Sequence, residues 1–249
     1  MIFSSPIFII FFLPLVLLFF WTSIFFKFTR ITKIIIILFS LFFYAWWDIS
    51  YVPLIFLTIL FNFFTGNHIF YQKKKGLKIN RELFFGILMN LIPLIYFKYT
   101  SFFLSQFYFI DNIFASKFEF LLPLGISFYT FQQISYLVDI ARGLESEKSL
   151  IDFSFFVLFF PQLIAGPIVR YNELKSQINF KLRNFNFEED LSVGITIFTN
   201  GLFKKIVLAD IFAIYVNRSF GAVESNISIN SLAAWIAAIS YVFQLYFDF

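Results

Sequence analysis

The chain has 249 residues, of which 60% are hydrophobic, 24% aromatic and 14% charged. A soluble globular chain carries about 25% charged residues, so the composition excludes an ordinary soluble protein and predicts an integral membrane protein. The formal net charge of +4 suits basic loops beside a membrane and gives no reason to expect a nucleic acid partner. Because the chain has no cysteine, it offers no disulfide framework, no thiolate metal site and no thiol nucleophile.

The first predicted membrane span covers residues 5–26, which contain no charged side chain. At about 1.5 Å per residue, this run is long enough to cross about 30 Å of hydrocarbon. A cleavable signal peptide is the alternative. The run lacks a basic start and a small-residue cleavage site, which favours a permanent helix.

Two further apolar runs cover residues 34–47 and 52–71. Basic residues separate the first span from the second, and the loop QKKKGLKINR follows the third. If the three helices alternate in direction, both basic segments lie on one side of the membrane, and the positive-inside rule makes that side cytoplasmic. The sequence therefore predicts that the N-terminus lies outside.

Residues 83–110 leave two alternatives open: one long tilted helix, or a short span that ends near Lys98 and continues as an interfacial piece. Residues 150–165 are also apolar. There, Pro161 and the Gly166-Pro167 pair predict a broken helix, because proline lacks a backbone donor. A broken helix at membrane depth is tolerated where it is buried in protein or lines a cavity.

The most polar segment, residues 168–192, is predicted to be an amphipathic or interfacial connection on the cytoplasmic side. Apolar residues return at 193–217 and at 232–246, and we find no internal repeat, low-complexity linker or soluble domain. The predicted fold class is therefore all-α: a multi-pass transmembrane helical protein with broken and interfacial helices, in which residues 1–249 belong to a single domain.

The stretch LLPLGISFYTFQQISYLVDIARG, residues 121–143, is apolar enough to enter a membrane but carries a regular set of polar residues. From Ile126 onward it predicts a helix, and at about 100° per residue the polar side chains share one face. They are Tyr129, Gln132, Ser135, Tyr136 and Asp139. Because an unsatisfied polar group in hydrocarbon costs several kcal/mol, this face is predicted to line a pocket or a protein interior. Asp139 either pairs with Arg142, which we favour, or orients a polar ligand.

Three motifs in this order carry a family resemblance: PLGISFYTFQQISYLVDIARG at 123–143, FFPQLIAGPIVRYNEL at 159–174 and GLFKKIVLAD at 201–210. They resemble the first half of the membrane-bound O-acyltransferase family. Within it they are most similar to the bacterial alginate O-acetyltransferase branch and, more distantly, to the lipoteichoic acid D-alanyl transferase. The segments FSSPIFIIFFLPL, LFFYAWWDISYVPL and YFKYTSFF also occur in the expected order, so the resemblance covers the whole chain.

The resemblance implies a multi-pass enzyme of the bacterial inner membrane. It would move an acyl group, most simply acetyl, from a cytoplasmic thioester donor to a hydroxyl of an exported polysaccharide or of a partner protein. The donor substrate would be acetyl-CoA or a carrier-linked acyl thioester, with no bound cofactor. The expected partners are the lipid bilayer, the polysaccharide acceptor and a periplasmic or extracellular acyltransferase.

The catalytic histidine of this family belongs to a region downstream of the residues present, so no residue of this chain is assigned a catalytic role. Residues 1–249 then correspond to the N-terminal part of the acyltransferase domain, truncated after YFDF, and are expected to be inactive alone. His68 is the sole histidine, and its place beside the basic loop favours an interfacial polar residue over a general base. The alternative functions are a non-catalytic remnant and a transporter-like membrane module.

Two groups are candidates for docking the donor, and no metal site is expected. Gly166, Pro167 and Arg170 form either a tight turn with a cytoplasmic anchor or a mouth where Arg170 meets a donor phosphate. Lys204 and Lys205 either extend to a lipid head group or help an anionic donor to bind. Asp210 could neutralise one of these lysines only if the helix bends, so no pair is predicted.

Overall fold

The computed structural model describes residues 3–106, 122–163, 166, 169–178 and 186–248. All regular elements in these ranges are helical, with no strand among them, which confirms the all-α prediction. The chain divides into two compact units. Unit 1 is made of residues 16–182, and unit 2 of residues 2–15 together with 183–249.

Four helical segments in the described ranges are long and apolar enough to cross a membrane. They are Phe8–Phe25, Ile49–Lys74, Asn80–Thr100 and Phe187–Glu224. The first consists of the π-helical turn η1 (Phe8–Phe12) and α1 (Leu13–Phe25), and agrees with the span predicted at 5–26.

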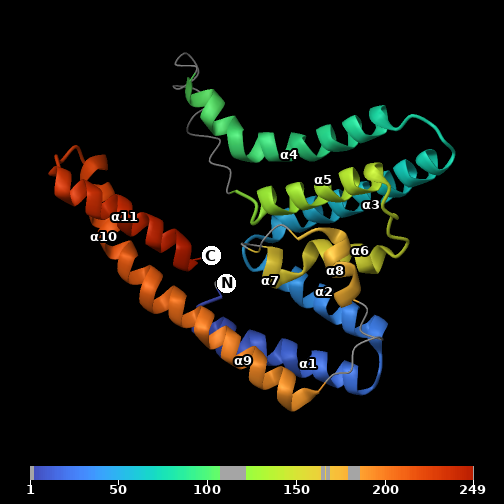
Figure 1. The fold of residues 1–249 in the computed structure, drawn as a ribbon, viewed down its shortest axis with the longest axis horizontal. Helices are drawn as coiled ribbons and strands as arrows, with labels where there is room; N and C mark the ends of the chain where they lie inside the picture. The colour runs from blue at the N-terminus through green and yellow to red at the C-terminus, as the bar shows by residue number, and fades with distance from the viewer. Residues whose placement is uncertain (1–2, 107–121, 164–165, 167–168, 179–185, 249) are drawn as a thin grey trace. The chain divides into compact units, whose positions relative to one another are not determined.

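Unit 1 contains most of the helices, seen from blue to yellow in Figure 1. They are α2 (Thr29–Ala45), η2 (Ile49–Tyr51), α3 (Val52–Lys74), α4 (Asn80–Gln106), α5 (Ile126–Arg142), α6 (Leu150–Leu158), α7 (Phe160–Leu163) and α8 (Tyr171–Ile178). The core lies where α2, α3, α5 and α6 meet, and includes the fully buried side chains of Ile55, Ile59, Leu137 and Phe153.

For residues 83–110 the structure shows one helix without a break as far as Gln106, of which Asn80–Thr100 is apolar enough to span a membrane, so both alternatives stay open. Helix α4 runs from Asn80 to Gln106 and carries Pro93 inside it. Residues 107–110 lie outside the described ranges.

Helix α5 begins at Ile126, as the sequence predicts, because Gly125 stops the helix on its N-terminal side. Gly125 has φ +65°, a left-handed conformation that glycine adopts without steric cost. A Cβ atom there would also collide with the carbonyl oxygen of Leu163. The start of α5 and the end of α7 are therefore packed backbone to backbone.

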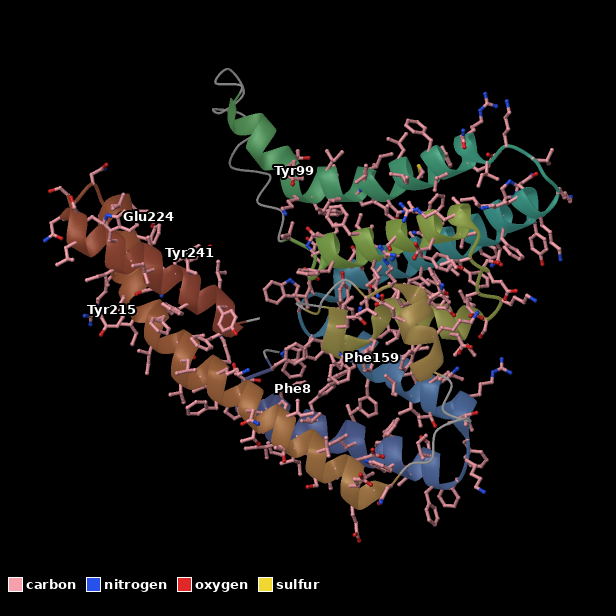
Figure 2. All side chains as sticks on the ribbon, viewed as in Figure 1. Phe8, Tyr99, Phe159, Tyr215, Glu224 and Tyr241 are labelled. Atoms are coloured by element: carbon pink, nitrogen blue, oxygen red, sulfur yellow. The ribbon has the colours of Figure 1, made fainter. Side chains whose placement is uncertain are left out.

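The break in the 150–165 segment falls earlier than predicted. Helix α6 ends at Leu158, and Phe159 turns the chain with ψ 103° before α7 begins (Figure 2 labels Phe159). If α6 continued, the ring of Pro161 would meet the carbonyl of Val157, four residues back, and that carbonyl would lack a donor. Pro161 sits instead in the first turn of α7, where a missing N–H costs little.

The basic segments of unit 1 gather at one end. The turn between α1 and α2, the loop between α3 and α4, and the end of α5 lie on the same side in Figure 1. At this end, Lys33 of α2 forms a 2.6 Å salt bridge with Asp152 of α6. The arrangement matches the alternating directions that the sequence predicted for the first three helices.

In unit 2, one helix extends well beyond the apolar run noted at 193–217. Helix α9 (Phe187–Phe203), the π-helix η5 (Lys204–Ala209) and α10 (Asp210–Glu224) follow each other without a gap over 38 residues. At about 1.5 Å per residue this is about 57 Å, well beyond the hydrocarbon thickness. Helix α11 (Ser231–Asp248) packs against α10 (Figure 1).

The segment predicted as an amphipathic or interfacial connection, residues 168–192, contains α8 and the start of α9 among its described residues. Glu188, Glu189 and Asp190 form the first turn of α9. Carboxylates are favourable there because the helix N-terminus carries partial positive charge.

Candidate functional site

The predicted polar face of α5 points into unit 1. Tyr129, Gln132, Tyr136 and Asp139 are buried, and Ser135 is half-buried. Their contacts differ greatly, so the face is not one uniform chamber wall. A lining role for these five residues stays a prediction, and the contacts below show which of their polar atoms are already engaged.

Gln132 supplies a hydrogen-bond donor to a backbone carbonyl that the break between α6 and α7 leaves without a helical partner. Its Nε2 donates a 3.0 Å hydrogen bond to the carbonyl of Phe156, in the last turn of α6. On the other side, the backbone N–H of Phe160 donates to Ser40 Oγ of α2 at 3.2 Å. Two side chains from other helices thus replace the hydrogen bonds that the break removes from these buried backbone groups.

Tyr136 anchors the loop that leaves α5. Its hydroxyl accepts a 3.0 Å hydrogen bond from the backbone N–H of Glu147. The buried Glu147 carboxylate accepts from the backbone N–H groups of Lys148 and Ser149 at 2.8 and 2.9 Å, and from the Tyr171 hydroxyl of α8. Burial, reinforced by this bond to Glu147, raises the pKa of Tyr171 above its ordinary value. This cluster ties α5, α8 and the loop together.

Sequence reasoning missed a buried amide network between α3, α4 and α5. Asn62 and Asn90 exchange two 2.8 Å hydrogen bonds, and Asn62 Nδ2 also donates to Gln133 Oε1. Gln133 Nε2 donates in turn to Thr58 Oγ1 at 3.2 Å. The signal was available, because Thr58 and Asn62 lie four residues apart within an apolar run and so share a helix face. Interhelical hydrogen bonds of this kind hold membrane helices together.

Four buried side-chain oxygens in unit 1 lack such partners: Glu82 Oε2 of α4, the hydroxyls of Tyr44 and Tyr129, and Asp139 Oδ2. The hydroxyls of Tyr44 and Tyr129 interact with each other across α2 and α5, but neither makes a hydrogen bond of normal geometry. The Oδ2 atom of Asp139 has no hydrogen-bond partner either. Arg142 is exposed and forms no salt bridge with Asp139, so the favoured pairing between them was wrong. Of the predicted face, Tyr129 and Asp139 keep buried polar atoms that a ligand could use.

The donor-docking candidates fall in both units. In unit 1, Arg170 is exposed before α8, and Gly166 lies so close to Gln162 that a Cβ atom would approach its Cα to 2.8 Å. Pro167 lies outside the described residues. In unit 2, Lys204 is exposed.

Lys205 makes the ion pair that the sequence did not predict. Its Nζ lies 3.1 Å from Asp210 and 2.6 Å from Asp248 of α11. The Asp210 contact arises because residues 204–209 are π-helical. In a π-helix the backbone hydrogen bonds join residues five apart, so the side chains of Lys205 and Asp210 lie closer together than in a regular α-helix.

His68 occupies an exposed position near the end of α3, where Gln72 Nε2 is its neighbour at 3.4 Å. This placement agrees with an interfacial polar residue. Within the ranges that the structure describes, no three His, Cys, Asp or Glu side chains group in a way that could hold a metal ion.

Comparison with known proteins gives consistent matches. The model of the MBOAT, membrane-bound O-acyltransferase family, matches residues 143–249. The chain is 37% identical to a peptidoglycan O-acetyltransferase of Helicobacter pylori and 34% identical to a probable alginate O-acetylase of Azotobacter vinelandii. These alignments cover 100% of this chain and 51% and 49% of the relatives. A teichoic acid D-alanyltransferase of Streptococcus thermophilus is 28% identical over 51% of this chain and 31% of its own length.

Several helices that are long and apolar enough to cross a membrane, together with buried hydrogen bonds between helices, define a multi-pass helical membrane protein. The family model and the relatives, whose alignments cover this whole chain, confirm the resemblance to the membrane-bound O-acyltransferase family seen in its motifs. The chain spans about half the length of the curated relatives it matches.

Proposed function

We propose that the protein is a membrane O-acyltransferase that transfers an acyl group, acetyl in the simplest case, to a hydroxyl group. The observation that carries this proposal is the alignment of the entire chain with two proteins named as O-acetylating enzymes. The proposed donor is acetyl-CoA or a carrier-linked acyl thioester on the cytoplasmic side of the bacterial inner membrane. No step of the transfer is assigned to a residue of this chain.

The proposed acceptor is a hydroxyl of an exported polysaccharide, reached directly or through a periplasmic or extracellular partner protein. The names of the relatives support this class, because peptidoglycan, alginate and teichoic acid are all polymers that carry hydroxyl groups.

Within unit 1, we propose that substrate meets the polar atoms that protein contacts leave unsatisfied. Of the four such atoms in this unit, the three that lie on α5 or beside it are the hydroxyls of Tyr44 and Tyr129 and the Oδ2 atom of Asp139. Gln132 and Tyr136 are engaged in structural hydrogen bonds, so their substitution should act on folding first. For donor docking, the exposed Arg170 and Lys204 are free to meet a phosphate, whereas Lys205 already has two carboxylate partners.

The test uses the full-length protein in its own membranes, supplied with an acyl thioester that carries a radiolabel on the acyl group. We expect label to appear in a hydroxyl-bearing polymer or in a partner protein. We also expect Arg170→Gln to raise the KM for the donor about tenfold, the equivalent of one charge-assisted contact. If membranes that contain the protein transfer no label while a control acetylase does, the proposal fails and a non-catalytic membrane module takes its place.

A further inference from the structure

A basic cavity of about 460 Å³ lies at the end of unit 1 where α3 and α5 end and α4 begins. Its lining includes three cationic side chains, those of Lys73, Lys78 and Arg142. Five aliphatic side chains and Asn80 complete the lining, which contains no acidic residue. Neither the docking candidates nor the polar face of α5 contribute to it.

The three cations of this cavity have no carboxylate within salt-bridge distance among the described residues, and the one acidic residue in the first turn of α4, Glu82, is not part of the lining. Lys73 Nζ donates a 2.6 Å hydrogen bond to the carbonyl of Ala141, which fixes the ammonium group and leaves two of its three donors unused. None of the three cations forms a salt bridge with a described residue. The first turn of α4 starts at Asn80, and its N–H groups add partial positive charge. The cavity is therefore built to receive an anion.

The aliphatic part of the lining favours a lipid over a soluble anion. Leu77, on the loop between α3 and α4, is part of this lining and leaves 55% of its surface exposed. A phosphate among the cations would thus continue into apolar surface, which suits the acyl chains attached to a phospholipid head group. A free phosphate would leave that surface uncovered.

We propose that this cavity binds the phosphate of an anionic phospholipid head group in the leaflet that faces the basic loops. Basic pockets between transmembrane helices at this level of a membrane are favourable sites for such head groups. The bound lipid would bridge the ends of α3 and α5 and the start of α4. This role is separate from the proposed acyl transfer and does not depend on it.

The experiment measures binding of acyl-labelled phosphatidylglycerol to the full-length protein in a zwitterionic detergent. The test variant is Lys73→Gln/Lys78→Gln/Arg142→Gln. Its matched control, Lys74→Gln/Lys75→Gln/Lys148→Gln, removes the same charge from exposed side chains outside the cavity. At about fivefold per charge, we expect the apparent Kd to rise about 100-fold in the test variant and less than threefold in the control.

Equal weakening in both variants would overturn the proposal, because it would mean attraction to general surface charge. Displacement of the labelled lipid by coenzyme A or inorganic phosphate at equal concentration would also overturn it, since the site would then serve a soluble phosphate. Displacement by unlabelled phosphatidylglycerol but not by phosphatidylcholine supports it. If the triple variant does not fold, the exposed single substitution Lys78→Glu is expected to weaken lipid binding at least fivefold, and unchanged binding would count against the site.

Discussion

Asn62 lies at the centre of the amide network that joins α3, α4 and α5. Its side chain is fully buried and bonds to Asn90, to Gln133 and to the backbone carbonyl of Thr58. Removing it leaves partner atoms without hydrogen bonds in a place that water does not reach. The energetic cost of a missing partner is larger there than the gain from any one bond.

We predict that Asn62→Ala lowers the stability of the protein in detergent by about 2 kcal/mol. Thermal unfolding of the purified protein, followed by circular dichroism, measures this change. Asn217→Ala, at an exposed position of α10, is the control and should leave the midpoint unchanged. Equal midpoints for both variants would show that the network contributes nothing to stability.

Gly66 of α3 is a glycine because the side chains packed against it leave no room for a Cβ atom, and not because of its backbone conformation. A Cβ atom there would lie 2.7 Å from Cε1 of Tyr136 and 2.9 Å from Cδ1 of Ile140. Tyr136 cannot move aside freely, because its hydroxyl is bonded to the N–H of Glu147.

We therefore expect Gly66→Ala to destabilise the protein by about 1 to 3 kcal/mol through overpacking. Gly221→Ala in α10 is the matched control, since nothing described lies within 4 Å of its added methyl group. Alanine is the better helix former, so the control should be neutral or slightly stabilising. A Gly66→Ala variant as stable as the control would contradict the packing at this position.

At the scale of elements, η5 sets the partners of α10 and α11. Its π-helical register brings Lys205 to Asp210, and the same ammonium group reaches Asp248. Lys205 is therefore the electrostatic link between the long helix of unit 2 and α11.

A double-mutant cycle of Lys205→Met and Asp248→Asn should give a coupling free energy of about 0.5 kcal/mol, because both side chains are partly exposed and solvent weakens the pair. The free energy of unfolding in detergent is the quantity measured. The same cycle with Lys204→Met in place of Lys205→Met serves as control and should show no coupling. Coupling to Lys204 instead would place the register of the helix one residue away.

At the scale of the whole molecule, the gathering of basic segments at one end of unit 1 gives a clear topology prediction. We expect the loop between α3 and α4 to face the cytoplasm and the segment before α3 to face outside. The absence of cysteine in this chain makes single-cysteine labelling direct.

In a background without other cysteines, a membrane-impermeant maleimide should label Ser50→Cys in intact cells and Lys75→Cys only after the cells are opened. Both positions are exposed, so access to the reagent is the variable that differs. The reverse labelling pattern would invert the whole topology. Labelling of both positions in intact cells would show that the two ends do not lie on opposite sides.

The sequence predicts the helices well here because a membrane span requires a long run of apolar residues, which is easily recognised. Glycine and proline then mark where the helices end. Gly125 located the start of α5 correctly, and Pro161 located a break to within two residues. The partners of polar residues were not predictable in the same way. Lys205 pairs with Asp210 because the helix is locally π-helical. Arg142 does not pair with Asp139 because Asp139 is buried and Arg142 is exposed. The regular period of an α-helix indicates neither result.

The break between α6 and α7 has a consequence for how the chain is made. Its exposed backbone groups are satisfied by Ser40, which precedes it by 120 residues, and by Gln132, which precedes Phe156 by 24. Both partners are therefore synthesised before the segment that needs them. During biosynthesis, α2 and α5 would therefore be inserted before the segment that contains the break. The hydrogen-bond partners of that segment would be present when it is inserted, and its backbone groups would not remain unsatisfied.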